Sequence, residues 1–139
     1  MRTIKARLKS LSLVDSKIKS KRLEIASLRS GILTAVQYTD EPRGGSQKNS
    51  SEELNARIID KTEEIYQEIE RIYDDRDRLV KAIDNLEDPL QSQILRLKYV
   101  NGYSWSMIYR EFPLHSRSTL FDMCKKGEQL LEKSLDYLD

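Results

Sequence analysis

Apolar residues recur every seventh position along the first part of the chain, within residues 3–36. One heptad position is held by Ile4, Leu11, Ile18, Ile25 and Ile32. A repeat sustained over this length is typical of a coiled-coil seam rather than of one face of a globular helix. Charged residues occupy much of the second seam position, where they cost stability but can fix register and partner choice. The pattern predicts a long helix over residues 3–36.

A second heptad repeat runs through residues 51–86 and predicts a second long helix. Its seam residues are Ile58, Ile65, Ile69, Ile72 and Leu79. Each helix would be about 50 Å long, at ~1.5 Å per residue. Residues 39–50 include Pro42 and the Gly44-Gly45 pair, which favour a flexible loop. Two helices of equal length joined by a loop predict a long antiparallel hairpin, although the loop length leaves pairing between chains open.

Turn and capping residues divide the rest of the chain into shorter helices. Pro89 suits the first position of a helix that ends at Gly102. Ser104 and Ser116 are predicted N-caps of two further helices, and Pro113 separates them. The sequence therefore predicts an all-α protein with a helical hairpin over residues 1–86 and a helix-turn-helix domain over residues 87–139.

Composition and charge agree with long helices and narrow cores. Hydrophobic residues make up 38% and charged residues 34% of the chain. Residues 1–36 carry a net charge of +7, residues 51–86 carry −5, and residues 86–139 carry −1. Opposite charges on two helices of similar length favour their pairing.

The same composition limits the chemistry and the compartment that we expect. Cys124 is the sole cysteine, so an intrachain disulfide and a cysteine metal cluster are excluded, and a reducing cytoplasm is expected. No stretch reaches the roughly 18 apolar residues of a membrane span, so we expect no membrane association. We expect no cofactor, metal or catalytic residue, because no nucleophile, base and orienting group occur together.

Residues 94–120 combine an apolar first helix, Gly-x-Ser-Trp followed by isoleucine, a turn, and Ser-x-x-Thr-Leu. The residues that carry this pattern are Ile94, Leu95, Leu97, Tyr99, Gly102, Ser104, Trp105, Ile108, Ser116, Thr119 and Leu120. The pattern resembles region 4 of bacterial sigma factors. Together with an upstream helical region, the module is similar to small late-gene activators of the ArpU or RinA type from phages of Gram-positive bacteria. The resemblance implies a transcriptional regulator that binds double-stranded DNA, with RNA polymerase as a further partner.

The resemblance also implies a recognition helix that starts at Ser116 and enters the major groove. Its outward, DNA-binding residues would be Arg117, Ser118, Phe121, Asp122, Lys125 and Lys126. Arg117 would pair with guanine and the two lysines would bind phosphates, while Arg110 on the preceding helix would hold the DNA backbone. Trp105 and Cys124 are interpreted as core residues.

Residues 86–139 have few basic residues and a net charge of −1, so functions other than DNA binding stay open. The turn has Phe112-Pro113 where Leu-Gly is usual, and Asp122 opposes binding to phosphate. A homo-oligomer, with a dimer favoured, would multiply the contacts with DNA through seam-mediated pairing. One alternative is a DNA-packaging adaptor similar to a terminase small subunit. Another is a protein-interaction factor that binds RNA polymerase or another host protein without DNA.

Overall fold

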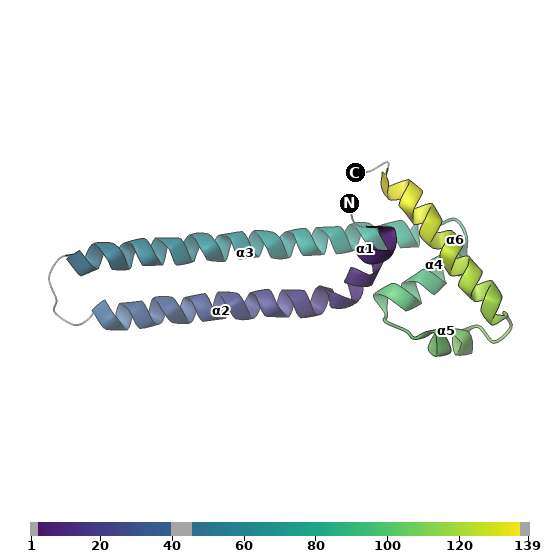
Figure 1. Ribbon diagram of the computed structural model, residues 1–139, viewed down its shortest axis with the longest axis horizontal. Helices are drawn as coiled ribbons and strands as arrows, with labels where there is room; N and C mark the ends of the chain where they lie inside the picture. Colours follow the sequence, from purple (N-terminus) through teal and green to yellow (C-terminus); the bar gives the residue numbers. More distant parts are fainter. Residues whose placement is uncertain (1–2, 40–45, 137–139) are drawn as a thin grey trace. The chain divides into compact units, whose positions relative to one another are not determined.

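The structure is a computed structural model that describes residues 3–39 and 46–136, with side chains over residues 3–31 and 51–135. Its described part contains helices and no strand, which confirms the all-α prediction. The helical elements are α1 (Ile4–Ser10), the 3-10 turn η1 (Leu11–Leu13), α2 (Val14–Thr39), α3 (Ser46–Asp84), α4 (Pro89–Leu95), the π-helical turn η2 (Arg96–Val100), α5 (Trp105–Glu111) and α6 (Arg117–Asp136). Figure 1 labels the helices α1 to α6 and colours the chain along its sequence.

The first predicted helix is interrupted, which corrects the expectation of one helix over residues 3–36. Helix α1 begins with Thr3, whose hydroxyl accepts a hydrogen bond from the amide of Ala6. Next to η1, Ser10 donates to the carbonyl of Arg7 at 2.6 Å and Ser12 donates to that of Lys9 at 2.9 Å. Serine hydroxyls that compete for backbone carbonyls favour such a local tightening.

Helix α3 is longer than predicted and replaces part of the predicted loop. It starts at Ser46, and α2 ends at Thr39, so only residues 40–45 of the predicted loop over 39–50 lie outside the described residues. The side chain of Ile32 is also outside the described part. The helix breakers Pro42, Gly44 and Gly45 are confined to that short interval, whereas residues 46–50 contain neither proline nor glycine.

The chain forms two compact units, whose boundary differs from the predicted one at residue 86. One unit, here the terminal unit, combines the chain up to Val14 with the chain from Asp74 onward. The other, here the paired-helix unit, spans Asp15–Tyr73. The predicted division assumed that both heptad repeats belong entirely to one hairpin, and the first turns of the first repeat do not.

The terminal unit has a core to which both ends of the chain contribute. Two residues of the predicted seam, Ile4 and Leu79, are buried in this core rather than between α2 and α3. Leu8 is fully buried with them, and α1 packs against α6. Arg7 of α1 also forms an ion pair with Asp75 of α3 at 3.2 Å. The other core residues are Ile83, Ile94, Leu95, Leu97, Tyr99, Ile108, Leu120, Cys124, Leu131 and Leu135.

The paired-helix unit consists of α2 and the first part of α3, which run side by side in opposite directions (Figure 1). Lys21 forms an ion pair with Glu68, and Arg29 donates to the hydroxyl of Tyr66 at 3.1 Å. The hydrogen bond and charge of Lys21 lower the pKa of the Glu68 carboxyl. Among the seam residues, Ile72 is partly buried here and Leu11 is partly buried in the terminal unit. The buried seam residues of the pair are Ile18, Ile25, Ile58, Ile65 and Ile69.

Close packing of α4 against α6 fixes the base of the candidate site. Asp88 caps α4 by accepting hydrogen bonds from the amides of Leu90 and Gln91. Gly102, which follows η2, has a φ of 73°, a conformation that glycine adopts without strain. A Cβ atom on Gly127 would lie 2.7 Å from Cδ1 of Leu95. Glycine at this position therefore lets α4 and α6 approach each other closely.

Candidate nucleic-acid interface

Two capped helices joined by a short turn form the candidate site. Ser104 caps α5 by accepting from the amide of Met107, and Ser116 caps α6 by accepting from that of Thr119 at 3.2 Å. The connection over residues 112–116 is closed by the amide of His115, which donates to the carbonyl of Phe112. Both predicted N-caps are therefore confirmed. Each satisfies a backbone amide that the helix start leaves unpaired.

Helix α6 presents a buried face and an exposed face. Leu120, Cys124 and Leu131 are buried against the core. The structure places every predicted recognition residue on the exposed face; these residues are Arg117, Ser118, Phe121, Asp122, Lys125 and Lys126. Arg110 is also exposed on α5, where its Nε donates to the carbonyl of Ser106. The predicted residues are thus all exposed, and those of α6 lie in its first half.

Three aromatic rings join α5 to α6 beside these residues. The Trp105 ring stacks on that of Tyr109 with 5.6 Å between centroids, and lies 5.5 Å from that of Phe121. Trp105 is only partly buried, so its prediction as a core anchor holds for one side of the ring. We call Trp105, Tyr109 and Phe121 the aromatic cluster. The spacing of Trp105 and Tyr109, one helical turn apart, is the sequence signal that could have revealed it.

A cation lies over each ring of the aromatic cluster. Lys98 is 4.6 Å from the Trp105 centroid, Arg117 is 5.0 Å from that of Tyr109, and Lys125 is 4.7 Å from that of Phe121. The electron-rich face of an aromatic ring attracts such cations. The cluster therefore gathers three positive charges on one surface of a segment whose net charge is slightly negative. Lys98 was not predicted as a site residue.

Polar side chains beneath the exposed face of α6 form a partly buried hydrogen-bonded group. The hydroxyl of Tyr99 donates to Oε1 of Glu128, and the thiol of Cys124 lies 3.5 Å from the same atom. Burial raises the pKa of the Cys124 thiol to about 12, with the Glu128 carboxylate adding to the effect. Burial and the Glu128 hydrogen bond also raise the pKa of Tyr99. Cys124 is thus a protonated core residue at neutral pH, as its interpretation from the sequence required.

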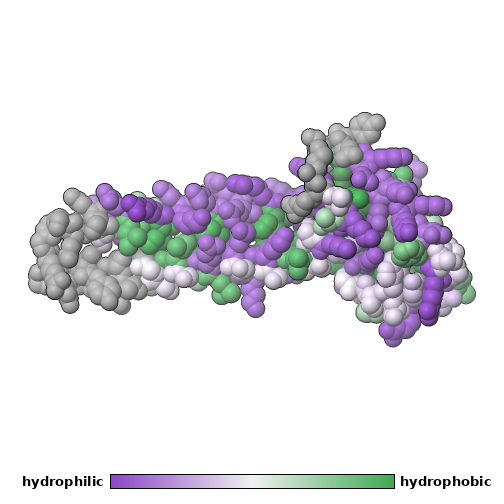
Figure 2. All heavy atoms as spheres, viewed as in Figure 1, coloured by the Kyte–Doolittle hydropathy of each residue, from purple (hydrophilic) through white to green (hydrophobic). Residues whose placement is uncertain are grey.

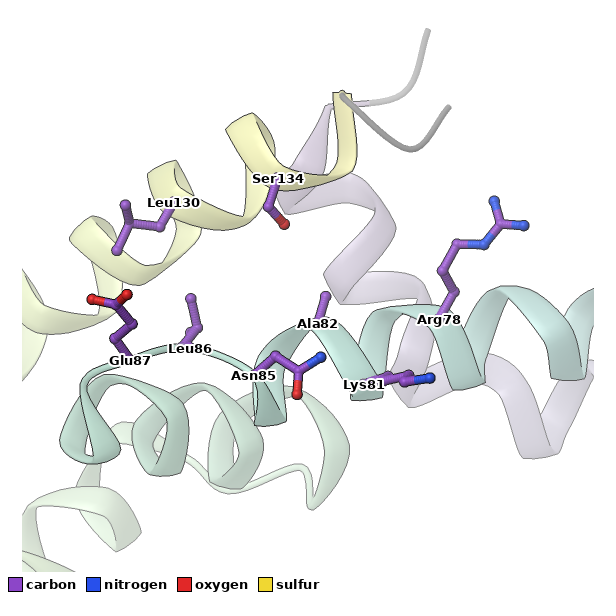
Figure 3. Close-up of a pocket in the computed structure, with 8 residues that line it drawn as sticks. All are labelled: Arg78, Lys81, Ala82, Asn85, Leu86, Glu87, Leu130 and Ser134. Atoms are coloured by element: carbon purple, nitrogen blue, oxygen red, sulfur yellow. The ribbon is translucent and has the colours of Figure 1, made fainter.

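A second surface feature of the terminal unit is a groove beside the second half of α6, here the α6 groove. Its volume is about 760 Å³, and Figure 3 shows Leu130 and Ser134 of α6 on one side. The opposite side comes from the end of α3 and the turn after it, through Arg78, Lys81, Ala82, Asn85, Leu86 and Glu87. Its apolar centre with charged rims is suited to a protein segment.

The described residues form neither a cluster of metal-binding side chains nor a membrane span. No group of three or more His, Cys, Asp or Glu side chains is arranged there to hold a metal ion. Within the same part of the chain, every helix is too short or too polar to cross a bilayer.

A family model for a protein of unknown function, DUF1492, matches residues 32–132. The chain belongs to the DUF1492 family. The DUF1492 match covers α4, α5 and most of α6, so the candidate site lies within the part shared with the family. No curated protein and no solved structure matches the chain. The resemblance to sigma factor region 4 and to phage late-gene activators therefore stays a prediction that rests on the residues quoted for it.

Proposed function

We propose that this DUF1492 protein is a DNA-binding transcriptional regulator of phage or prophage origin. In this proposal α5 and α6 form a helix-turn-helix, and the first turns of α6 enter the major groove. The observation that carries the proposal is the two-faced packing of α6. Its inner face is fixed in the core, while Arg117, Ser118 and the following predicted residues are exposed together.

The charges around the aromatic cluster support contact with DNA, through phosphates for the lysines and through a base for Arg117. Three cations, Lys98, Arg117 and Lys125, lie over the rings of the cluster. These contacts restrain the charged groups, which therefore stay close to the cluster. Phosphate contacts supply most of the affinity of a DNA-binding protein and make it sensitive to salt. Asp122 lies on the same face and weakens this attraction, so one copy would bind weakly.

A dimer would compensate for that weakness by bringing two recognition helices to one DNA molecule. We interpret α2 and α3 as an antiparallel, coiled-coil-like hairpin that serves this oligomerisation. The buried isoleucines between the two helices and the Lys21–Glu68 ion pair support the hairpin. The opposite charges of residues 1–36 and 51–86 support its pairing.

Selection from a pool of genomic DNA fragments, followed by titration at several salt concentrations, tests the proposal with the full chain. Arg117→Ala should weaken binding to the selected site about 10-fold or more, because a base contact is lost. Lys125→Ala should weaken binding to all sequences and reduce the salt slope by about one. Lys133→Ala, an exposed lysine in the last turn of α6, is the matched control and should change neither value. Absence of salt-sensitive binding at low salt would overturn the proposal.

A second candidate is a protein-interaction role without DNA, for which the α6 groove is the specific observation. Leu130 is 46% exposed at its edge, and Arg78, Lys81 and Glu87 supply charges around it. Leu130→Lys should then abolish capture of a stoichiometric host protein such as RNA polymerase and leave DNA binding unchanged. Loss of DNA binding in the same variant would count against this candidate.

A further inference from the structure

The paired-helix unit exposes an apolar stripe on α3 that its own α2 leaves uncovered. Ile59, Tyr66 and Tyr73 are 61%, 42% and 40% exposed and follow one another at seven-residue intervals. Residues so spaced share one face of a helix. Figure 2 shows exposed apolar side chains among hydrophilic ones along α2 and α3. We call these three residues the α3 stripe; they are additional to the seam that faces α2.

A groove of about 310 Å³ lies beside the α3 stripe and is lined mainly by α2. Tyr73 borders it from α3, and Leu23, itself 61% exposed, borders it from α2. Its remaining lining residues are Asp15, Ile18, Lys19 and Arg22. The groove, here the α2 groove, therefore places apolar surface next to two exposed cations. Arg29, which follows Arg22 by seven residues, reaches the hydroxyl of Tyr66 and extends this basic border along the stripe.

The other border of the α3 stripe is acidic. Glu63 and Glu70 are exposed and follow Ile59 and Tyr66 by four residues, so they lie beside the stripe. The residues that precede the stripe by one position, Ile58 and Ile65, are buried toward α2. The two glutamates therefore border the stripe on the side away from α2. One face of the unit thus runs from basic α2, over the apolar stripe, to acidic α3.

We propose that this face binds a second copy of the same chain, with α3 of each copy packed against α2 of the other. A two-fold axis parallel to the helices places the acidic border of one copy on the basic border of the other. An axis across the helices would instead set basic against basic and acidic against acidic. Charge complementarity therefore selects the first arrangement, in which Arg22 meets Glu70 of the second copy.

The proposal names the surface of the dimer on which the proposed function relies, and it rests on that function only for the expectation of dimerisation. The α3 stripe leaves apolar surface of Ile59, Tyr66 and Tyr73 in water, and burial of that surface supplies the driving force for association. The charged borders then fix the orientation of the two copies.

Light-scattering mass of the full chain without DNA, over a range of concentrations, tests this inference. We expect twice the chain mass of 16.3 kDa. Ile59→Lys should raise the dissociation constant at least about 10-fold by placing a charge in the apolar stripe. Leu54→Lys is the control, because Leu54 is also on α3 and 44% exposed but precedes the buried seam residue Ile58 by four positions, which places it on the seam side of the helix. A monomer at every concentration, a larger ring, or equal effects of both variants would overturn the proposal.

Charge reversal tests the orientation independently of any loss of folding. Arg22→Glu and Glu70→Arg should each weaken the dimer about 10-fold, and the double variant should restore most of the affinity. Failure of the double variant to restore association would overturn the proposed pairing. Because no DNA is present in these measurements, their failure is distinct from failure of DNA binding.

Discussion

Gly127 shows how one missing side chain sets the distance between two helices. Gly127→Ala should lower the free energy of unfolding by about 1–3 kcal/mol, because its Cβ would lie 2.7 Å from Cδ1 of buried Leu95. Gly31→Ala in α2 is the control, since its Cβ would lie 3.9 Å from the nearest atom, Cδ1 of Ile58. In this second variant the free energy of unfolding should rise by about 0.5–1 kcal/mol, because alanine has a higher helix propensity than glycine. Urea denaturation measures both, and destabilisation by both variants would contradict the close approach at Gly127.

Burial of the Cys124 thiol predicts a loss of stability at high pH. Its pKa rises from the ordinary 9.0 to about 12 on folding. Between these values the unfolded chain releases the thiol proton and the folded chain retains it, so the free energy of unfolding falls as pH rises. Urea midpoints at about pH 8 and about pH 10.5 should differ less for Cys124→Ala than for the natural chain. Equal differences would show that the thiol does not titrate as proposed.

Trp105 and Leu8 show which single residues the sequence can and cannot assign. Inward packing of Trp105 follows from its position at the start of a capped helix, but its half-exposed stacking depends on Tyr109 and Phe121. In the sequence, Leu8 is one more apolar residue at a helical offset within a heptad repeat. Its burial in a core built mainly by residues beyond Asp74 is set by tertiary packing. Local periodicity reports that a residue is buried and gives no information on which partner buries it.

At the scale of the elements, α1 acts as a core element of the terminal unit. Leu8→Ala should destabilise that unit by about 2–5 kcal/mol, because the side chain is fully buried. Leu13→Ala, five residues away and 53% exposed, should change stability by less than about 1 kcal/mol. Amide hydrogen exchange in α6 should increase in the first variant only. Unchanged exchange in α6 would contradict the packing of α1 against it.

Helix existence was predictable from the sequence, whereas helix interruptions were not. The caps Asp88, Ser104 and Ser116 act within one turn, so their effect is visible in the local sequence. The 3-10 turn at Leu11–Leu13 and the π-helical turn at Arg96–Val100 lie inside continuous helical patterns. Serine hydroxyls beside the first turn favour it locally but do not by themselves specify an interruption. The two turns contact each other in the terminal unit, so packing also contributes to where they form. The exposed face of α6 was predictable because the apolar and polar residues of this one helix follow the helical period.

For the whole molecule, the proposed dimer and the proposed DNA contact should be linked. Ile59→Lys should reduce affinity for a DNA site with two half-sites about 10-fold or more, and leave affinity for a single half-site unchanged. The physical reason is that two linked recognition helices bind as one ligand. Fluorescence anisotropy with both DNA lengths measures the difference. Equal loss on both lengths would place Ile59 in the DNA contact itself.

The packing of α1 with α6 bears on how the protein is made. Synthesis on the ribosome proceeds from the N-terminus, so Leu8 leaves the exit tunnel long before Leu131, which belongs to the same core. Until α6 has emerged, α1 lacks part of the core against which it packs. Contacts between such distant parts of a chain close a large loop and slow folding. Helix α1 should therefore gain protection from proteases only once α6 has left the exit tunnel. In a chain stopped before α6, α1 should remain open to cleavage.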